Sequence, residues 1–76
     1  MEPGAMPART GRVAAFDLRR GLGTLESTEG ERFDFHCTQV ADGTRSVPVG
    51  AIVRYVVVPG SLGRWEAAAV DAISVG

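Results

Sequence analysis

Two stretches decide the fold: Arg20-Gly21-Leu22-Gly23-Thr24-Leu25-Glu26 and Arg32-Phe33-Asp34-Phe35-His36-Cys37. In the first, glycines two positions apart allow the backbone to bend and then to enter a strand. In the second, two phenylalanines alternate with an aspartate and a histidine, which is typical of a half-buried strand. We therefore predict that the two stretches pair as an antiparallel hairpin across residues 27–31.

The predicted hairpin has one exposed face, and four side chains share it: Leu22, Thr24, Asp34 and His36. The alternating phenylalanines then point to the opposite, buried face. We look for the functional site on the exposed face.

Size and composition bound the class of protein. The chain has 76 residues, of which 45% are hydrophobic, enough for one small core. A single cysteine excludes an internal disulfide and favours a reducing compartment. The first residues show neither the basic nor the apolar region of a secretory signal, so we expect a cytoplasmic protein. With a net charge of −1, nucleic-acid binding would need local arginines or stacking rather than bulk charge.

The remaining pattern predicts an all-β domain at residues 11–76, preceded by a flexible tail at 1–10. Short apolar or alternating runs separated by glycine-rich turns predict strands at 12–17, 23–27, 32–37, 51–58 and 65–73. Alanine favours helix, but we read the alanines at 67–69 as strand, because a fifth strand closes an otherwise open sheet. The expected architecture is a five-stranded antiparallel Greek-key barrel.

A family resemblance follows from the order and spacing of several motifs. They are Gly11-Arg12-Val13, Phe16-Asp17, Arg20-Gly21-Leu22-Gly23, Phe33-Asp34-Phe35-His36, Gly50 and Ala67-Ala68-Ala69-Val70. Together they resemble the cold-shock domain over about residues 11–73. The resemblance implies an OB-fold that binds single-stranded RNA or DNA.

The resemblance also shows what is missing. The family stacks bases on aromatic rings, and this sequence has Leu22, Thr24, Asp34 and Cys37 at four such positions, with Ala15 at a fifth. Stacking contributes about 1–3 kcal/mol per base, so even partial losses weaken binding by several powers of ten. Ordinary cold-shock affinity is therefore not expected.

Some residues could compensate, and each has a structural alternative. Trp65 is either a new stacking ring or a cap on the barrel end, and Phe16 either stacks at the sheet edge or folds inward. Arg20 and Arg45 either contact phosphates or are solvated turn charges, while Leu22 and Thr24 could simply cover the sheet.

Metal binding and catalysis are not expected. His36 and Cys37 are adjacent on a strand and should face opposite sides, and only Asp34 stands near them. The same geometry argues against a nucleophilic cysteine with a histidine base. We predict no enzyme and no cofactor.

Two functional hypotheses follow. The first is a cold-shock-like module that binds single-stranded RNA or DNA weakly or with altered specificity, through Phe16, Arg20, Leu22, Thr24, His36, Arg45 and Trp65. The second is a degenerate cold-shock fold that binds a protein or itself through the same face. The surface would consist of Leu22, Thr24 and Cys37, which stand in place of aromatic residues, and of the outward valines at 56 and 58.

Overall fold

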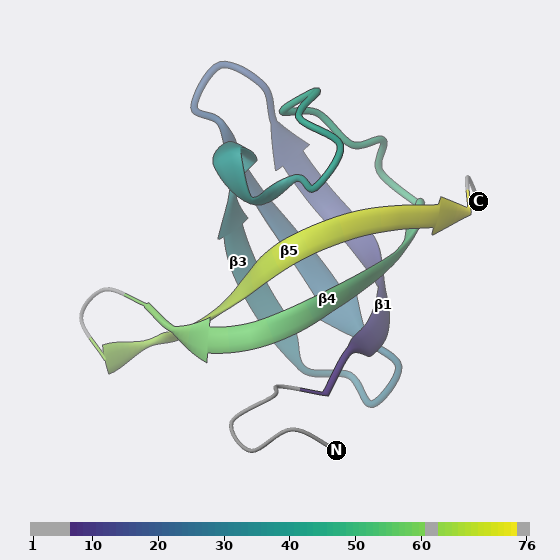
Figure 1. Cartoon of the computed structure of the whole chain (residues 1–76), viewed down its shortest axis with the longest axis vertical. Coiled ribbons are helices and arrows are strands. Elements are labelled where there is room, and N and C mark those ends of the chain that lie inside the picture. The colour runs from purple at the N-terminus through teal and green to yellow at the C-terminus, as the bar shows by residue number, and fades with distance from the viewer. Residues whose placement is uncertain (1–6, 61–62, 75–76) are drawn as a thin grey trace.

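Five strands and one short 3-10 helix make up the described part of the computed structural model, residues 7–60 and 63–74. They are β1 (Arg9–Asp17), β2 (Leu22–Ser27), β3 (Arg32–His36), η1 (Cys37–Gln39), β4 (Ile52–Pro59) and β5 (Trp65–Ser74). The strands close into a barrel in the order β1-β2-β3-β5-β4 (Figure 1). The predicted all-β barrel of five strands is thus confirmed. In the described residues, no helix has the length and apolar character needed to cross a membrane.

The strand directions differ from the prediction at one place. Four of the neighbouring pairs are antiparallel, as predicted, but β3 and β5 run parallel and are in register only at Asp34 and Glu66. A second parallel contact follows between Val40 and Val70, outside the ladder. Few main-chain hydrogen bonds therefore close the barrel between β3 and β5.

The first strand begins earlier than predicted. It starts at Arg9, because Arg9 to Arg12 pair with Tyr55 to Ile52 of β4 and so close the barrel. Arg9 and Thr10, expected in the flexible tail, therefore belong to the barrel. Residues 1–6 of that expected tail lie outside the described residues.

The alanines at 67–69 lie in β5, as predicted, and not in a helix. A register shift in the β4–β5 ladder leaves Ala69 with a left-handed backbone, at φ 52°. Its N–H donates to the side-chain oxygen of Gln39 at 3.3 Å, which links η1 to β5.

The core follows the alternation of side chains along the strands. In β4, Val53 and Tyr55 are buried and Val57 packs against them, whereas Arg54 is exposed. The whole buried set is Val13, Leu25, Phe33, Phe35, Val40, Val47, Ala51, Val53, Tyr55, Ala67 and Val70.

Tyr55 carries a polar atom into this core. Its side chain is 1% exposed, and among the described residues its hydroxyl makes no hydrogen bond of good geometry. Burial raises the pKa of Tyr55, and the positive charge of Arg9 opposes part of this effect, as does the Ser27 side chain, which lies close enough to lower the Tyr55 pKa slightly. Such a hydroxyl costs free energy in the folded state.

We expect Tyr55→Phe to leave stability unchanged or to raise it by about 1 kcal/mol, because it removes an unpaired buried group. The pH dependence should change as well. The pKa of Tyr55 is higher in the folded than in the unfolded state, so its protonated form stabilises the native state. This contribution is fully present below the unfolded pKa of about 10 and is lost as pH rises through the folded pKa. Denaturant titrations at pH 7 and at alkaline pH should show that the phenylalanine variant loses less unfolding free energy on going to alkaline pH than the parent does. A large destabilisation at pH 7 would contradict this account.

Two turns hold the hairpins of the first three strands. Between β1 and β2, Gly21 adopts φ 67° and donates to the carbonyl of Asp17 at 2.8 Å. Between β2 and β3, the buried Ser27 hydroxyl accepts hydrogen bonds from the N–H groups of Glu29 and Glu31 at 3.2 and 3.0 Å. The predicted hairpin across 27–31 is therefore confirmed.

Candidate nucleic-acid interface

The register of the strands places outward side chains in two rows across the sheet. In the first row, Ala15 lies beside Thr24, Thr24 beside Asp34, and Asp34 beside Glu66. We call Ala15, Thr24, Asp34 and Glu66 the floor row. The second row consists of Asp17, Leu22 and His36. The four residues predicted to share the exposed face of the hairpin do share it.

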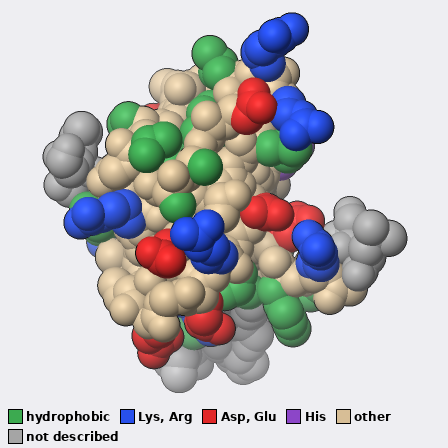
Figure 2. All heavy atoms as spheres, turned by 180° about the vertical axis from the view of Figure 1, so that it is seen from behind, with side chains coloured by type: hydrophobic (Ala, Val, Ile, Leu, Met, Phe, Trp, Pro, Cys, Tyr) green, Lys and Arg blue, Asp and Glu red, His purple; other side chains and the backbone are tan. Residues whose placement is uncertain are grey.

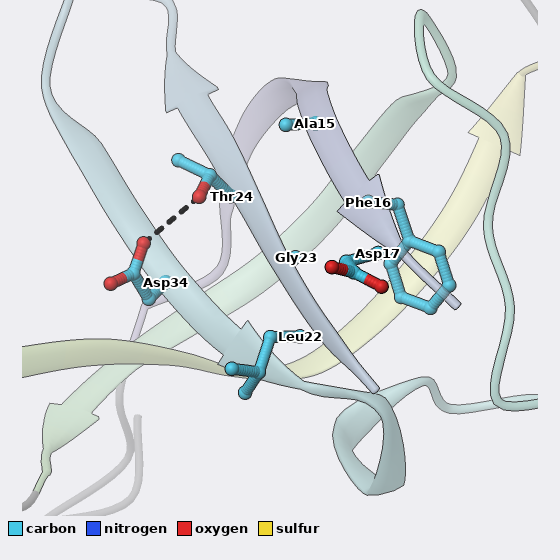
Figure 3. A pocket seen from close by; sticks show the side chains of 7 residues that line it. All are labelled: Ala15, Phe16, Asp17, Leu22, Gly23, Thr24 and Asp34. Carbon is cyan, nitrogen blue, oxygen red and sulfur yellow. Dashed lines mark hydrogen bonds between the residues drawn. The ribbon is translucent and has the colours of Figure 1, made fainter. Parts of the chain in front are cut away.

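Asp34 lies at the centre of this surface, because it lines three shallow hollows. The first, drawn in Figure 3, runs over β1 and β2 to Asp34. The second lies between Leu22, His36 and Glu66. The third lies between Arg32, Arg64 and Trp65. We call the surface formed by these three hollows the Asp34 face.

A hydrogen bond fixes the carboxylate of Asp34. The Thr24 hydroxyl donates to Oδ1 of Asp34 at 2.9 Å (Figure 3). Among the described residues, the ion pairs join Arg9 to Glu31 and Arg32 to Glu26, and none involves Asp34. The centre of the face therefore carries an exposed negative charge.

Phe16 lies on the core side of the sheet. Its register partner is Gly23, which in turn lies opposite the buried Phe35. The rings of Phe16 and Phe35 stack, with their centroids 6.1 Å apart. Gly23 has no side chain between them, and an added Cβ would lie 2.9 Å from Phe16. Of the two alternatives, the structure supports the inward one, with Phe16 half-buried and contributing to one hollow.

His36 is the exposed aromatic of the second row. Its Nδ1 accepts from the Thr38 N–H at 3.3 Å and lies 3.0 Å from the Thr38 hydroxyl. A neutral ring that accepts at Nδ1 carries its proton on Nε2, which is then free to donate. His36 thus offers both a ring face and a hydrogen-bond donor.

The predicted separation of His36 and Cys37 is wrong. The strand ends at His36 and Cys37 begins η1, so the chain turns and brings Sγ to 3.9 Å from Nδ1 of His36. The expected strand to residue 37 is one residue too long for this reason. In the described residues, no three His, Cys, Asp or Glu side chains gather as metal ligands would.

Trp65 lies where the Asp34 face meets the barrel end. It is 60% exposed and lines one hollow with Arg64 and Asp34. It also lines another hollow with Phe33, which is part of the core, and Val57, which packs against the core. The ring can therefore cap the barrel with one part and remain accessible with another.

The two predicted phosphate contacts line none of the three hollows. Arg20 is exposed in the β1–β2 turn, and its backbone N–H donates to Oδ1 of Asp17 at 3.1 Å. Arg45 is exposed in the loop between η1 and β4, with a left-handed backbone at φ 60°. Neither side chain lines the Asp34 face, whereas Phe16, Leu22, Thr24, His36 and Trp65 all do.

The sequence did not indicate Glu66 as a site residue. It joins the floor row only because β3 and β5 pair in parallel, a contact between distant segments that alternation cannot show. Its side chain extends over Gly60, which leaves room for it.

Charge on this side of the barrel is mixed. Figure 2 views the molecule from behind, the side of β1, β2 and β3, and shows arginines interspersed with acidic side chains and small apolar areas. There is no continuous basic surface in this view. Binding of a polyanion here would depend on individual arginines and on ring contacts.

Comparison with solved structures supports the fold. A cold-shock domain structure of Drosophila Unr, named CSD456, is similar to this chain with a TM-score of 0.75 and 24% sequence identity. The match covers 91% of this chain, which spans 28% of the length of the Unr chain. No protein-family model and no curated protein matches the sequence. The similarity shows that the chain has the barrel of a cold-shock domain.

Proposed function

We propose that this barrel binds single-stranded RNA or DNA through the Asp34 face, weakly and with an altered base preference. The observation that carries the proposal is the arrangement of the outward rows. The cold-shock resemblance assigns several positions to base contact, and these positions lie on one hollowed surface. An exposed histidine and a tryptophan that is 60% exposed lie at the border of this surface.

The chemistry of this surface supports weak binding. His36 and Trp65 supply rings for stacking, while the family's other ring positions hold a leucine, a threonine and an aspartate. Arg64 lies within the face and Arg20 beside it, where both could contact phosphates. The carboxylates of Asp34 and Glu66 oppose them. The site therefore offers few contacts that favour binding, and the negative charges at its centre repel phosphates.

An oligonucleotide titration tests the proposal. At low salt, fluorescein-labelled single-stranded heptamers should increase in anisotropy when the protein is added, and the emission of Trp65, the only tryptophan, should change. We expect Trp65→Ala to weaken binding about tenfold, because one stacking contact is lost. Absence of any anisotropy change at high micromolar protein would reject the proposal.

Arg20→Ala tests the phosphate contact separately. It should weaken binding of all sequences to a similar degree and reduce the dependence of affinity on salt by about one counterion. Arg12→Ala is the matched control, because Arg12 is exposed on β1 opposite Glu26, away from both rows, whereas Arg20 is hydrogen-bonded through its backbone N–H to Asp17 of the second row. Equal losses in both variants would mean that only general charge matters.

The second candidate is a protein-binding or self-associating module. The observation that favours it is the apolar Leu22, which is 45% exposed at the centre of the second row. The outward valines contribute less than predicted, because Val56 and Val58 are half-buried. Light scattering after size-exclusion chromatography tests the self-associating form of this candidate, which requires a concentration-dependent increase in mass.

A further inference from the structure

The floor row offers a base the wrong surface for stacking and a suitable one for hydrogen bonding. Ala15 and Thr24 are small, so they leave a trough beside Asp34. Thr24 donates to Oδ1 of Asp34, but a carboxylate has about four acceptor positions on its two oxygens. Asp34 can therefore accept further hydrogen bonds while Thr24 holds it in one orientation.

A base in this trough would meet Asp34 with its edge. The edge that suits a carboxylate carries N–H donors, and the edge that it repels carries carbonyl oxygens. Guanine presents two neighbouring donors, N1–H and the N2 amino group, which match the two oxygens of a carboxylate. Adenine and cytosine present one amino group each. Uracil and thymine place their single N3–H between two carbonyl oxygens.

The charges of the face are consistent with this orientation. Asp34 lies beside Glu66 across the β3–β5 pair, so two acidic side chains occupy the middle of the surface. Phosphates are repelled from there, while Arg64 lines the third hollow, on the side of Trp65. The backbone of a bound strand would therefore follow the rim, with its bases pointing inward to the floor row.

Resting on the proposed function, we infer that Asp34 selects guanine over uracil and thymine in a bound single strand, and that Thr24 acts as the positioning residue of its carboxylate. The site thus reads the edge of one base instead of stacking on its face. Contacts of this kind specify a base, whereas stacking is tolerant of sequence.

The test compares heptamers that differ in one base. The probes are UUUUUUU, UUUGUUU and UUUIUUU, where I is inosine, which lacks the N2 amino group, together with their deoxythymidine counterparts. Anisotropy titrations at low salt should show that the guanine heptamer binds about tenfold or more tightly than the uracil heptamer. Inosine should lose most of that preference. A 7-deazaguanine heptamer should keep it, because it retains both donors.

Variants connect the preference to Asp34. Asp34→Asn replaces an acceptor by an amide and should reduce the guanine preference to within about twofold, while UUUUUUU binds more tightly because a negative charge is removed. Thr24→Val should reduce the preference partly. Asp71→Asn, on the outer side of β5 at the register of Arg54, removes an acidic charge elsewhere and should leave the preference unchanged.

The outcomes separate this inference from the function on which it rests. If no heptamer binds, the proposed function fails and the inference with it. If the heptamers bind equally, or if Asp34→Asn keeps the guanine preference, the proposed function stands and the selection by Asp34 is wrong. Thermal unfolding of each variant confirms that an altered preference is not a folding defect.

Discussion

Replacing Thr24 and Asp34 together by phenylalanine should tighten binding of single-stranded heptamers about 30- to 1000-fold. The two residues lie directly opposite each other on β2 and β3 and point outward, so the new rings would form a continuous stacking surface. Stacking contributes about 1–3 kcal/mol per base, and an estimate of about 2–4 kcal/mol allows for non-additive gains. Removal of the Asp34 charge acts in the same direction.

Two measurements make this result specific. The double variant should lose any guanine preference while it gains affinity, because rings are tolerant of sequence and the carboxylate is gone. Ile73→Phe is the control for a general effect of an added ring, since Ile73 is 45% exposed on β5 and lines none of the hollows of the Asp34 face. An unchanged affinity of a folded double variant would show that the Asp34 face is not the binding surface.

Gly23→Ala should destabilise the barrel by about 2–3 kcal/mol or more, a large part of the stability of so small a domain. An added Cβ would lie 2.7 Å from Cε1 of Phe35 and 2.9 Å from Cδ1 of Phe16. Phe35 is 1% exposed and cannot turn away without disturbing the core. Denaturant unfolding should therefore show a lower midpoint, with a slope similar to that of the parent.

A double-variant cycle identifies the cause. Phe35→Leu alone should destabilise the barrel, but it shortens the group that the new methyl meets. Gly23→Ala combined with Phe35→Leu should therefore cost less than the sum of the two single changes. Additive losses would mean that the alanine acts through the backbone and not through this contact.

Local alternation was enough to predict the strands. The buried Val53 and Tyr55, the hairpin across 27–31 and the placement of the alanines at 67–69 in a strand all follow from local patterns and turn residues. The separation of His36 and Cys37 fails for a local reason, because η1 begins directly after β3, but two other differences depend on distant partners. The start of β1 at Arg9 is set by β4, and the parallel contact at Asp34 is set by β5.

Sequence predicts the candidate site only where its residues follow the alternation of side chains along neighbouring strands. Leu22, Thr24, Asp34 and His36 were placed on one face because they occupy alternate positions of two paired strands. Glu66 was missed because it reaches the face through a long-range pairing. Sequence alone does not decide which side of the sheet Phe16 takes, because the register shift between Val13 and Ala15 interrupts the alternation in β1.

The sparse pairing of β3 with β5 has a consequence for ligand binding. The floor row crosses this joint between Asp34 and Glu66, where the two strands share a single register pair and two acidic side chains lie next to each other. A molecule stretched along the row would bridge the joint and hold the two strands together. Binding of a ligand to the floor row and closure of the β3–β5 joint are then thermodynamically linked, so a bound ligand would oppose local opening of the barrel at this joint. A change that loosens the joint would in turn release the ligand before the rest of the protein unfolds.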